Sequence, residues 1–303
     1  MLIARLIADS DTLGDRLALA MEQIEETGAE VLGAGMLDSN PAVLELELAD
    51  ADAVTVRAVL DRHFADADLL LVPGPIMLPR LFVSDMDSTM IGQECIDELA
   101  DFAGLKDHVA AITARAMRGE IDFVTALHER VGLLAGLPES TITQCLDQRI
   151  RPMPGAVTLV RTLQAHGARC VLVTGGFHAF ADTVAAALGF DRVVGNRLET
   201  ADGVLTGRLL GDIIDSTAKR AVLVAALAEL GEGAVSLATG DGANDIPMLR
   251  AATHGIAFRA KPTARAAADG RVDHGDLTTI LDLYGIASDA WVGDEVRQAA
   301  FRL

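Results

Sequence analysis

The residues best suited to chemistry are two aspartates, Asp85 and Asp87, which follow the apolar run Leu81-Phe82-Val83 and Ser84. Such a run is typical of a buried strand, and an open α/β sheet builds its ligand sites at the carboxyl ends of its strands. Two acids there require a compensating positive group. Mg²⁺ binds one or two carboxylates and leaves its other positions to water and phosphate oxygens, so it meets that need. The alternative is a turn and a Ser/Thr helix cap without a ligand.

A second acidic loop, residues 240–245, follows another short apolar strand late in the chain, residues 235–239. Its glycines relieve the backbone while the loop presents two acids and an amide. Because the carboxyl ends of parallel strands meet at one edge of a sheet, we expect four carboxylates from the two loops to form a metal cage. They are Asp85, Asp87, Asp241 and Asp245.

Two further segments could bind a phosphate. Thr174-Gly175-Gly176 ends a predicted strand at 168–174, and its hydroxyl and side-chain-free amides suit close approach to an anion, although such a tripeptide is also a common turn. Lys219 follows Ser216-Thr217, a predicted helix cap, so the helix dipole and the ammonium would both favour an anion there. A lysine in a first turn is more often simply solvated.

Composition limits the possible partners. The chain has 303 residues and a net charge of −19, which argues against nucleic acid and gives no reason to expect binding to anionic membranes. It has only three lysines, Lys106, Lys219 and Lys261, so we expect each to have a specific role. The N-terminal apolar run is too short for a signal peptide, and charges interrupt every hydrophobic stretch before the roughly 18 residues that a membrane helix needs. We therefore expect a cytoplasmic protein.

The three cysteines, Cys95, Cys145 and Cys170, are far apart and lack C-x-x-C spacing. This pattern predicts buried thiols in a reducing cytosol rather than disulfides or a zinc site. Cys95 lies nearest to the acidic loop in the sequence.

The N-terminal residues predict a separate small domain. Strand patterns alternate with two helical patterns, the first starting at Asp11 or Thr12, in the ferredoxin-like order βαββαβ. The order resembles ACT-like regulatory domains, and the alternative is a packing or dimerisation module without a ligand. Several prolines at 73–79 predict a stiff linker. The expected boundaries are 1–73 for this domain, 74–80 for the linker and 81–303 for the rest.

The segment 94–152 has helical patterns and almost no strand signal. A helical insert after the first strand would lie over the site as a cap and exclude water. Phe123, Leu127 and Arg130 share one helix face, at positions i, i+4 and i+7. Core packing is the default for the two apolar residues. A guanidinium on that face needs a carboxylate or phosphate partner, and a structural salt bridge satisfies this as well as a substrate does.

In this order, the motifs resemble those of the haloacid dehalogenase-like phosphohydrolases over residues 80–285. They are D-x-D-S-T at 85, T-G-G at 174, Lys219 and G-D-G-x-N-D at 240. The helical cap, Glu94 and the F-x-x-x-L-x-x-R-V segment that ends at Val131 resemble the phosphoserine phosphatase family within that group. Thr174 departs slightly, since these relatives often have serine there, but the hydroxyl is kept. The resemblance implies an α/β fold with a Rossmannoid parallel sheet and an inserted helical cap.

The resemblance also implies a catalytic role for two residues. Asp85 would attack phosphorus and form an aspartyl-phosphate, and Asp87 would protonate the leaving oxygen and later deprotonate water. Mg²⁺ would be held by the Asp85 carboxylate, the Asp87 backbone carbonyl and Asp241, with Asp245 steering the metal's surroundings.

Substrate contacts follow from the same resemblance. Thr174, Gly175 and Lys219 would hold the phosphoryl oxygens. Asn244 would orient Lys219 or the substrate, and Phe123 would contribute to the substrate pocket. Glu94 and Arg130 would bind the ammonium and carboxylate of a zwitterion. These residues complete the predicted site.

The expected activity is Mg²⁺-dependent hydrolysis of O-phosphoserine, the last step of serine biosynthesis. One alternative is a related phosphatase or phosphotransferase for another small phosphomonoester, such as phosphothreonine or homoserine phosphate. The other is a catalytically inactive, amino-acid-sensing regulatory protein. The sequence leaves open a homodimer, an effector of the N-terminal domain and the role of residues 287–303.

Overall fold

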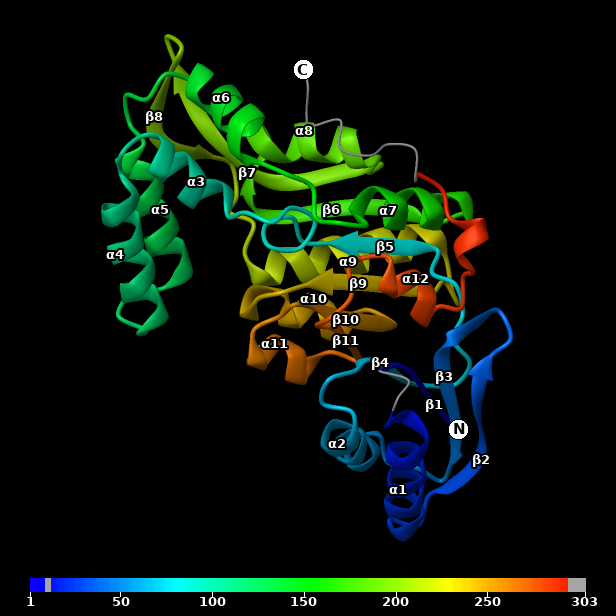
Figure 1. Ribbon diagram of the computed structural model, residues 1–303. Helices are drawn as coiled ribbons and strands as arrows, with labels where there is room; N and C mark the ends of the chain where they lie inside the picture. The colour runs from blue at the N-terminus through cyan, green and yellow to red at the C-terminus, as the bar shows by residue number, and fades with distance from the viewer. Residues whose placement is uncertain (9–11, 294–303) are drawn as a thin grey trace.

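The computed structural model describes residues 1–8 and 12–293, and in this part of the chain eleven strands form one mixed sheet (Figure 1). The strand order is β2-β3-β1-β4-β11-β10-β9-β5-β6-β7-β8. The strands are β1 (Leu2–Ile7), β2 (Glu30–Leu37), β3 (Asn40–Ala49), β4 (Asp68–Pro73), β5 (Leu81–Ser84), β6 (Arg169–Phe177), β7 (Arg192–Ala201), β8 (Val204–Leu210), β9 (Ser236–Gly240), β10 (His254–Phe258) and β11 (Gly270–Val272).

Helices pack on both faces of the sheet. Others lie beyond the carboxyl ends of its central strands (Figure 1). The helices are α1 (Leu13–Glu26), α2 (Ala53–His63), α3 (Cys95–Phe102), α4 (Lys106–Met117), α5 (Phe123–Leu133), α6 (Ser140–Arg149), α7 (Ala156–Ala165), α8 (His178–Leu188), α9 (Ser216–Leu230), α10 (Ile246–Ala251), α11 (Pro262–Ala267) and α12 (Thr279–Leu283), with short 3₁₀ turns η2 (Ala243–Asp245) and η3 (Ser288–Ala290).

The N-terminal segment has the predicted element order, β1-α1-β2-β3-α2-β4. Alternate residues of β1, Leu2, Ala4 and Leu6, are buried in one cluster with residues of α1 and α2, as the period of two in a strand requires. The described part of α1 begins at Leu13, and the alternative start at Asp11 lies outside the described residues.

The sheet does not stop at the predicted linker, because β4 pairs antiparallel with β11. A Cβ on Gly270, the first residue of β11, would lie 2.7 Å from the Leu69 backbone oxygen, so this pairing needs glycine. The sequence patterns predicted neither β11 nor α11. A three-residue strand is too short to show alternation of apolar and polar residues. Helix α11 has only six residues, three of them alanine, so it is too short to show a helical period. The division into domains remains a prediction.

The strands that carry the predicted motifs lie side by side and parallel. Phe82 of β5 pairs with Cys170 of β6 and with Leu237 of β9. Phe82 packs in the cluster that includes α7, α8 and α12, whereas Leu81 and Val83 pack in the cluster that includes α9 and α10. Because β5 is buried on both faces, its first three residues are all apolar, and this is the pattern that predicted the strand.

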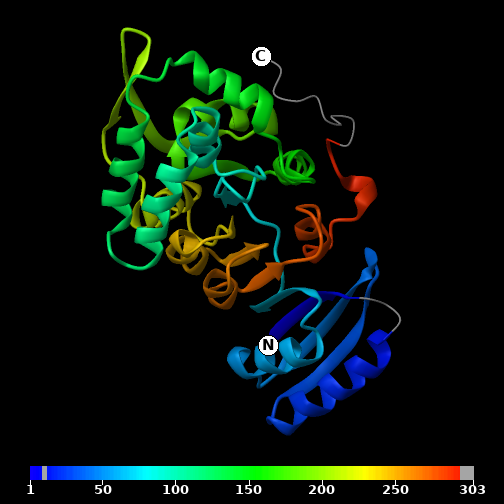
Figure 2. The same ribbon diagram turned by 60° about the vertical axis from the view of Figure 1, so that its left-hand side comes forward.

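The cap consists of α3, α4, α5 and α6, which lie between β5 and β6 in the chain and within the predicted segment 94–152. A bridge between Ile91 and Pro152 joins the two ends of this insertion. The β7–β8 hairpin also holds the cap, since Gly136 N donates to Leu205 O at 2.8 Å and Leu205 N donates to Leu137 O at 2.8 Å. The cap is therefore anchored at two places, and Figure 2 shows its helices from a second side.

All three cysteines are free and buried, as predicted. Trp291, near the end of the described chain, donates from Nε1 to the Ile286 backbone oxygen at 3.0 Å and packs against the main core. Residues 294–303 of the predicted tail lie outside the described part. None of the helices that the structure describes is long and apolar enough to cross a membrane.

Candidate active site

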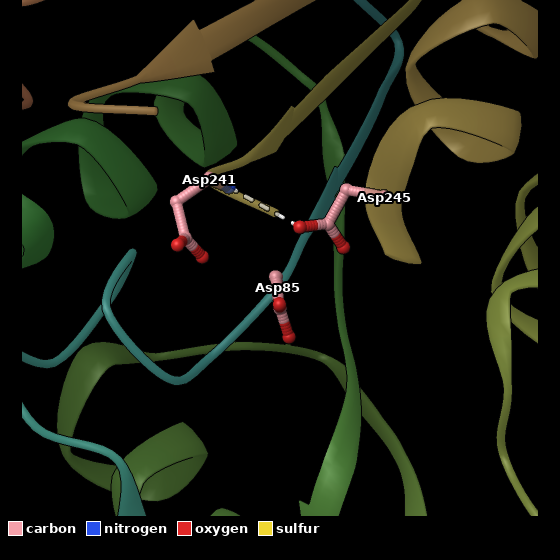
Figure 3. Close-up of side chains that lie close together, drawn as sticks. All are labelled: Asp85, Asp241 and Asp245. Carbon is pink, nitrogen blue, oxygen red and sulfur yellow. Dashed lines mark hydrogen bonds between the residues drawn. The ribbon is translucent and has the colours of Figure 1, made fainter. Parts of the chain in front are cut away.

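Three carboxylates converge at one edge of the sheet (Figure 3). Asp85 follows β5, Asp241 follows β9 and Asp245 ends η2, and one oxygen from each lies within 4.8 Å of the others. The two strands are adjacent and parallel, and Asp85 N donates to Thr239 O at 3.0 Å, so their ends meet as predicted. A Cβ on Gly240 would lie 2.4 Å from Asp245 Cγ, so this convergence requires glycine in the loop.

Lys219 lies behind these carboxylates and is 1% exposed. Its Nζ is 2.8 Å from Asp85 Oδ2 and 2.7 Å from Asp245 Oδ1. The anions that this first-turn lysine contacts are thus two side chains of the protein. We call Asp85, Asp241, Asp245 and Lys219 the floor of the site.

The helix that carries Lys219 starts one residue earlier than the sequence predicted. The cap is Asp215, whose side chain accepts from Ala218 N at 2.8 Å, rather than Ser216-Thr217. An aspartate can accept this bond with full negative charge, which also suits the positive end of the helix dipole.

Asp245 has both oxygens occupied. One contacts Lys219, and the other accepts from Asp241 N at 3.2 Å, drawn in Figure 3, and from Gly242 N at 3.0 Å. This saturation suits a residue that positions its neighbours rather than one that binds a ligand directly.

The floor carries more negative charge than one lysine compensates. Burial and then the charge of Asp245 raise the pKa of Asp85 well above its usual range, while Lys219 opposes this. Burial and Asp245 also raise the pKa of Asp241 to about 6. The donors are all carboxylate oxygens, which are the ligands that hard divalent cations prefer. The residues therefore fit a metal ion bound in front of Asp85 and Asp241.

Asp87 lies beside the floor, and its side chain is outside the group of three. Its Oδ1 is buried without a hydrogen-bond partner among the described residues. Burial, followed by the charge of Glu94, raises the pKa of Asp87 to about 7. A Cβ on Gly176 would lie 3.1 Å from Asp87 Oδ2, so the second glycine of the T-G-G segment makes room for this carboxyl. A carboxyl that titrates near neutrality suits proton transfer.

A cavity of about 330 Å³ opens between the floor and the cap. Predicted site residues that line it are Asp85, Asp87, Glu94, Phe123, Arg130, Thr174, Gly175, Asp241 and Asn244. Lys219 and Asp245 lie outside this lining, behind Asp85. The predicted contact of Lys219 with phosphoryl oxygens stays a prediction.

The T-G-G segment is held by a residue that the sequence did not reveal. The Thr174 hydroxyl accepts from Gly176 N at 2.8 Å, which fixes the turn. The Gly175 backbone oxygen accepts from Asn196 Nδ2 at 2.7 Å, and Asn196 Oδ1 accepts from Ile214 N at 2.9 Å. Asn196 on β7 is 2% exposed and joins two loops beside the cavity. A single amide within a hairpin strand gives no distinctive sequence signal.

The cap contributes two acids, Glu94 and Asp97, and one base, Arg130, to the opposite side of the cavity. The exposed Glu94 accepts from Ser88 Oγ through Oε1 at 2.7 Å. Arg130 on α5 donates from Nε to Ala126 O at 3.3 Å. Among the described residues, no carboxylate oxygen lies within 4.0 Å of its guanidinium, so the structural salt bridge left open by the sequence is not found.

The two apolar residues of this helix face differ. Leu127 is 2% exposed and belongs to the core, as predicted. Phe123 is 39% exposed, so core packing was the wrong default for it, and its Cζ would lie 3.5 Å from a Cβ on Gly175. The tip of its ring therefore lies against Gly175 of the T-G-G segment. We call Glu94, Phe123 and Arg130 the cap wall.

Comparison with known proteins identifies the family of the chain. A profile of the haloacid dehalogenase-like hydrolases matches residues 82–250. The chain belongs to this family. The phosphoserine phosphatase of Albidiferax ferrireducens is 44% identical over 211 residues, which cover 68% of this chain and 89% of that protein. The predicted resemblance to phosphoserine phosphatases is thus confirmed.

Other relatives are longer or similar over the whole chain. Phosphoserine phosphatase SerB2 of Mycobacterium tuberculosis is 47% identical over 208 residues, 68% of this chain, but the match spans only 51% of that protein. A haloacid dehalogenase family hydrolase from Salmonella enterica serovar Typhi superposes with a TM-score of 0.81 at 29% identity, covering 94% of this chain and 99% of that one. The α/β fold with its mixed sheet is therefore that of this hydrolase family.

Proposed function

We propose that the protein hydrolyses O-phosphoserine to serine and phosphate, the last step of serine biosynthesis. The observation that carries the proposal is a single cavity with an acidic floor suited to phosphoryl transfer and, on its cap side, the acids Glu94 and Asp97 and the base Arg130. A phosphoserine molecule has a phosphoryl group for the floor and an ammonium and a carboxylate for the wall. The similarity to phosphoserine phosphatases supports the same assignment.

Asp85 acts as the nucleophile. Its carboxylate attacks phosphorus, the bond to the serine oxygen breaks, and an aspartyl-phosphate forms. A serine alkoxide is a poor leaving group, so protonation by Asp87 as the bond breaks lowers the barrier. Asp87 then takes a proton from the water that hydrolyses the intermediate, and phosphate is released. Two easier steps replace one difficult displacement.

The metal site is proposed to be occupied by Mg²⁺. The ion would be held by the Asp85 carboxylate, the Asp87 backbone carbonyl and Asp241. The Asp245 carboxylate would orient Asp241, because it accepts a hydrogen bond from Asp241 N. When bound, the ion neutralises charge so that an anionic carboxylate can approach an anionic phosphoryl group. The raised pKa of Asp241, about 6 without a cation, supports this assignment.

The remaining residues position the substrate. The Thr174 hydroxyl and the Gly175 amide would hold phosphoryl oxygens, and Lys219 would keep Asp85 in place and contribute charge to the same oxygens. Asn244 lines the cavity and would contact the substrate or orient Lys219. Glu94 would bind the ammonium, Arg130 the carboxylate, and Phe123 would cover the substrate from the cap.

The N-terminal segment is proposed to be an ACT-like regulatory or dimerisation domain, residues 1–73. Its βαββαβ order supports this, and the Salmonella hydrolase is similar over a length that includes it. A homodimer and a cytoplasmic location belong to the same proposal, the latter supported by three free buried thiols.

A screen of phosphorylated metabolites tests the function, with phosphate release measured in Mg²⁺ and in EDTA. It includes both phosphoserine enantiomers, phosphothreonine and homoserine phosphate. We expect one phosphoserine enantiomer to give the highest kcat/KM and EDTA to abolish turnover. A higher kcat/KM for another ester would assign a related phosphatase, and no release from any ester would favour the inactive, amino-acid-sensing alternative.

A further inference from the structure

The residues that line the cavity carry more negative than positive charge. Five acids line it, namely Asp85, Asp87, Glu94, Asp97 and Asp241, against two bases, Arg130 and Lys261. The chain as a whole has a net charge of −19. A phosphomonoester dianion that approaches this cavity therefore meets a repulsive field, and a cation near the entrance would have a large effect on its capture.

Lys261 differs from the other two lysines in having its charge available. Lys219 is paired with two carboxylates, and the Lys106 Nζ lies 3.6 Å from Asp101 Oδ1. Within the described residues, no carboxylate oxygen lies within 4.0 Å of the Lys261 ammonium. Because Lys261 is exposed and also lines the cavity, its side chain lies at the opening.

The backbone fixes this position. After β10 the chain turns at Arg259, a non-glycine residue with φ of 44°, a conformation that side chains rarely adopt. Lys261 N then donates to the Asp241 backbone oxygen at 2.9 Å, and Pro262 starts α11. The lysine is therefore tied to the acidic loop that would hold the metal. Burial raises the pKa of Asp241, and the nearby Lys261 charge opposes that rise.

We propose that Lys261 binds the phosphoryl dianion as it enters the cavity and delivers it to the floor. Its long, flexible stem allows the ammonium to follow the phosphoryl group without a fixed geometry. The role rests on the proposed phosphatase function and adds a second basic residue to the cavity. Arg130 distinguishes phosphoserine by its carboxylate, whereas Lys261 recognises the phosphoryl group that all phosphomonoesters share.

The test compares the wild type with Lys261→Met and Lys261→Arg, using phosphoserine and p-nitrophenyl phosphate. Lys261→Met keeps the backbone bond to Asp241 and the length of the stem. At roughly 0.01 M ionic strength, where the Debye length is about 30 Å, we expect kcat/KM to fall about tenfold for both substrates with kcat nearly unchanged. At roughly 1 M, where the Debye length is about 3 Å, the difference should shrink to about twofold or less.

A binding measurement provides a readout independent of turnover. Titration calorimetry with inorganic phosphate should show a weaker affinity for Lys261→Met by a similar factor, and Lys261→Arg should retain most of the wild-type affinity. The matched control is Lys106→Met, which removes an equal charge from an exposed lysine that is already paired. It should change none of these values.

Three results would overturn the inference. They are an unchanged kcat/KM in Lys261→Met at low salt, an equal loss in Lys106→Met, and a loss confined to kcat without salt dependence, which would indicate a structural role. Failure of the proposed function gives a different result: the wild type would not turn over phosphoserine. The comparison on p-nitrophenyl phosphate and inorganic phosphate would still test Lys261.

Discussion

The two sides of the cavity are built in contrasting ways. On the floor, the buried Lys219 pairs with two of the three carboxylates: it is 1% exposed and joins Asp85 to Asp245. On the cap wall, Arg130 has no carboxylate partner among the described residues, and Phe123 is 39% exposed. The floor is preorganised without a ligand, whereas the wall has groups that a ligand would complete.

This difference assigns different tasks to the two sides. Nucleophilic attack and metal binding need atoms held in place before substrate arrives, and the buried ion pairs of Lys219 with Asp85 and Asp245 achieve this. Such groups would act on any phosphomonoester. Recognition of one ester needs charges that bind its other groups, and we expect Glu94 and Arg130 of the cap wall to supply them. We therefore expect floor mutations to impair every substrate and wall mutations to impair phosphoserine selectively.

Asp85→Asn should give the largest effect. The amide cannot act as the nucleophile, so kcat should fall about 10⁴-fold for phosphoserine and p-nitrophenyl phosphate alike, as for other essential catalytic groups. Phosphate release measures the loss, and thermal unfolding verifies the fold. Asp202→Asn, in the exposed β7–β8 turn where φ is 49°, is the matched control and should be fully active, since asparagine tolerates this conformation. Persistent turnover of Asp85→Asn would exclude Asp85 as the nucleophile.

Arg130→Ala should give a smaller and selective effect. Loss of a charged hydrogen bond to the substrate carboxylate should raise KM for phosphoserine about 10- to 100-fold. For p-nitrophenyl phosphate, which has no carboxylate, the change should stay below about twofold on the same reasoning. Arg115→Ala, which removes another cap arginine already 2.6 Å from Glu129 Oε2, serves as the control. An equal rise in KM for both substrates would show that Arg130 does not recognise the substrate carboxylate. It would also contradict the proposed difference between the cap wall and the floor.

Metal binding should stabilise the floor in a pH-dependent manner. Without metal, Asp241 and Asp87 have pKa values of about 6 and about 7, above the ordinary value of 3.8. Between pH 3.8 and these raised pKa values of about 6 and about 7, the folded protein therefore binds more protons than the unfolded chain. The free energy of unfolding of the metal-free protein falls as pH rises through that range. Mg²⁺ at about 100 times its Kd should raise Tm by about 5 °C at neutral pH and less in acid.

Two variants locate that stabilisation. Asp241→Asn should lose most of the Mg²⁺-induced rise in Tm, and Arg130→Ala should keep it, because only the first residue belongs to the floor. Differential scanning fluorimetry with Mg²⁺ or EDTA measures both. An equal rise at all pH values, or an undiminished rise in Asp241→Asn, would contradict the metal assignment.

Much of the floor was predictable because its residues follow strongly patterned strands. Both faces of β5 are buried, so its apolar run identified the strand, and Asp85 had to lie at its carboxyl end. The same reasoning placed Asp241 at the carboxyl end of β9. The glycines at 240 and 242 predicted a tight loop that brings Asp245 close to it. The parallel order of neighbouring strands then brought these acids together.

Residues held by long-range contacts were not predictable in this way. The burial of Lys219 behind two carboxylates depends on how α9 packs, which its local sequence does not encode. Asn196 joins the T-G-G segment to a distant loop without any motif of its own. The pairing of β4 with β11 involves only three residues of β11, so alternation could not reveal that the sheet continues past the linker.

The most direct measurement identifies the residue that receives the phosphoryl group. The enzyme would be mixed with phosphoserine and Mg²⁺, quenched in acid within one turnover, digested and analysed by mass spectrometry. The account predicts one phosphoryl group on the peptide that contains Asp85, located on that side chain and absent from Asp85→Asn. A phosphoryl group on another residue, or turnover with no covalent adduct in the first turnover, would contradict it.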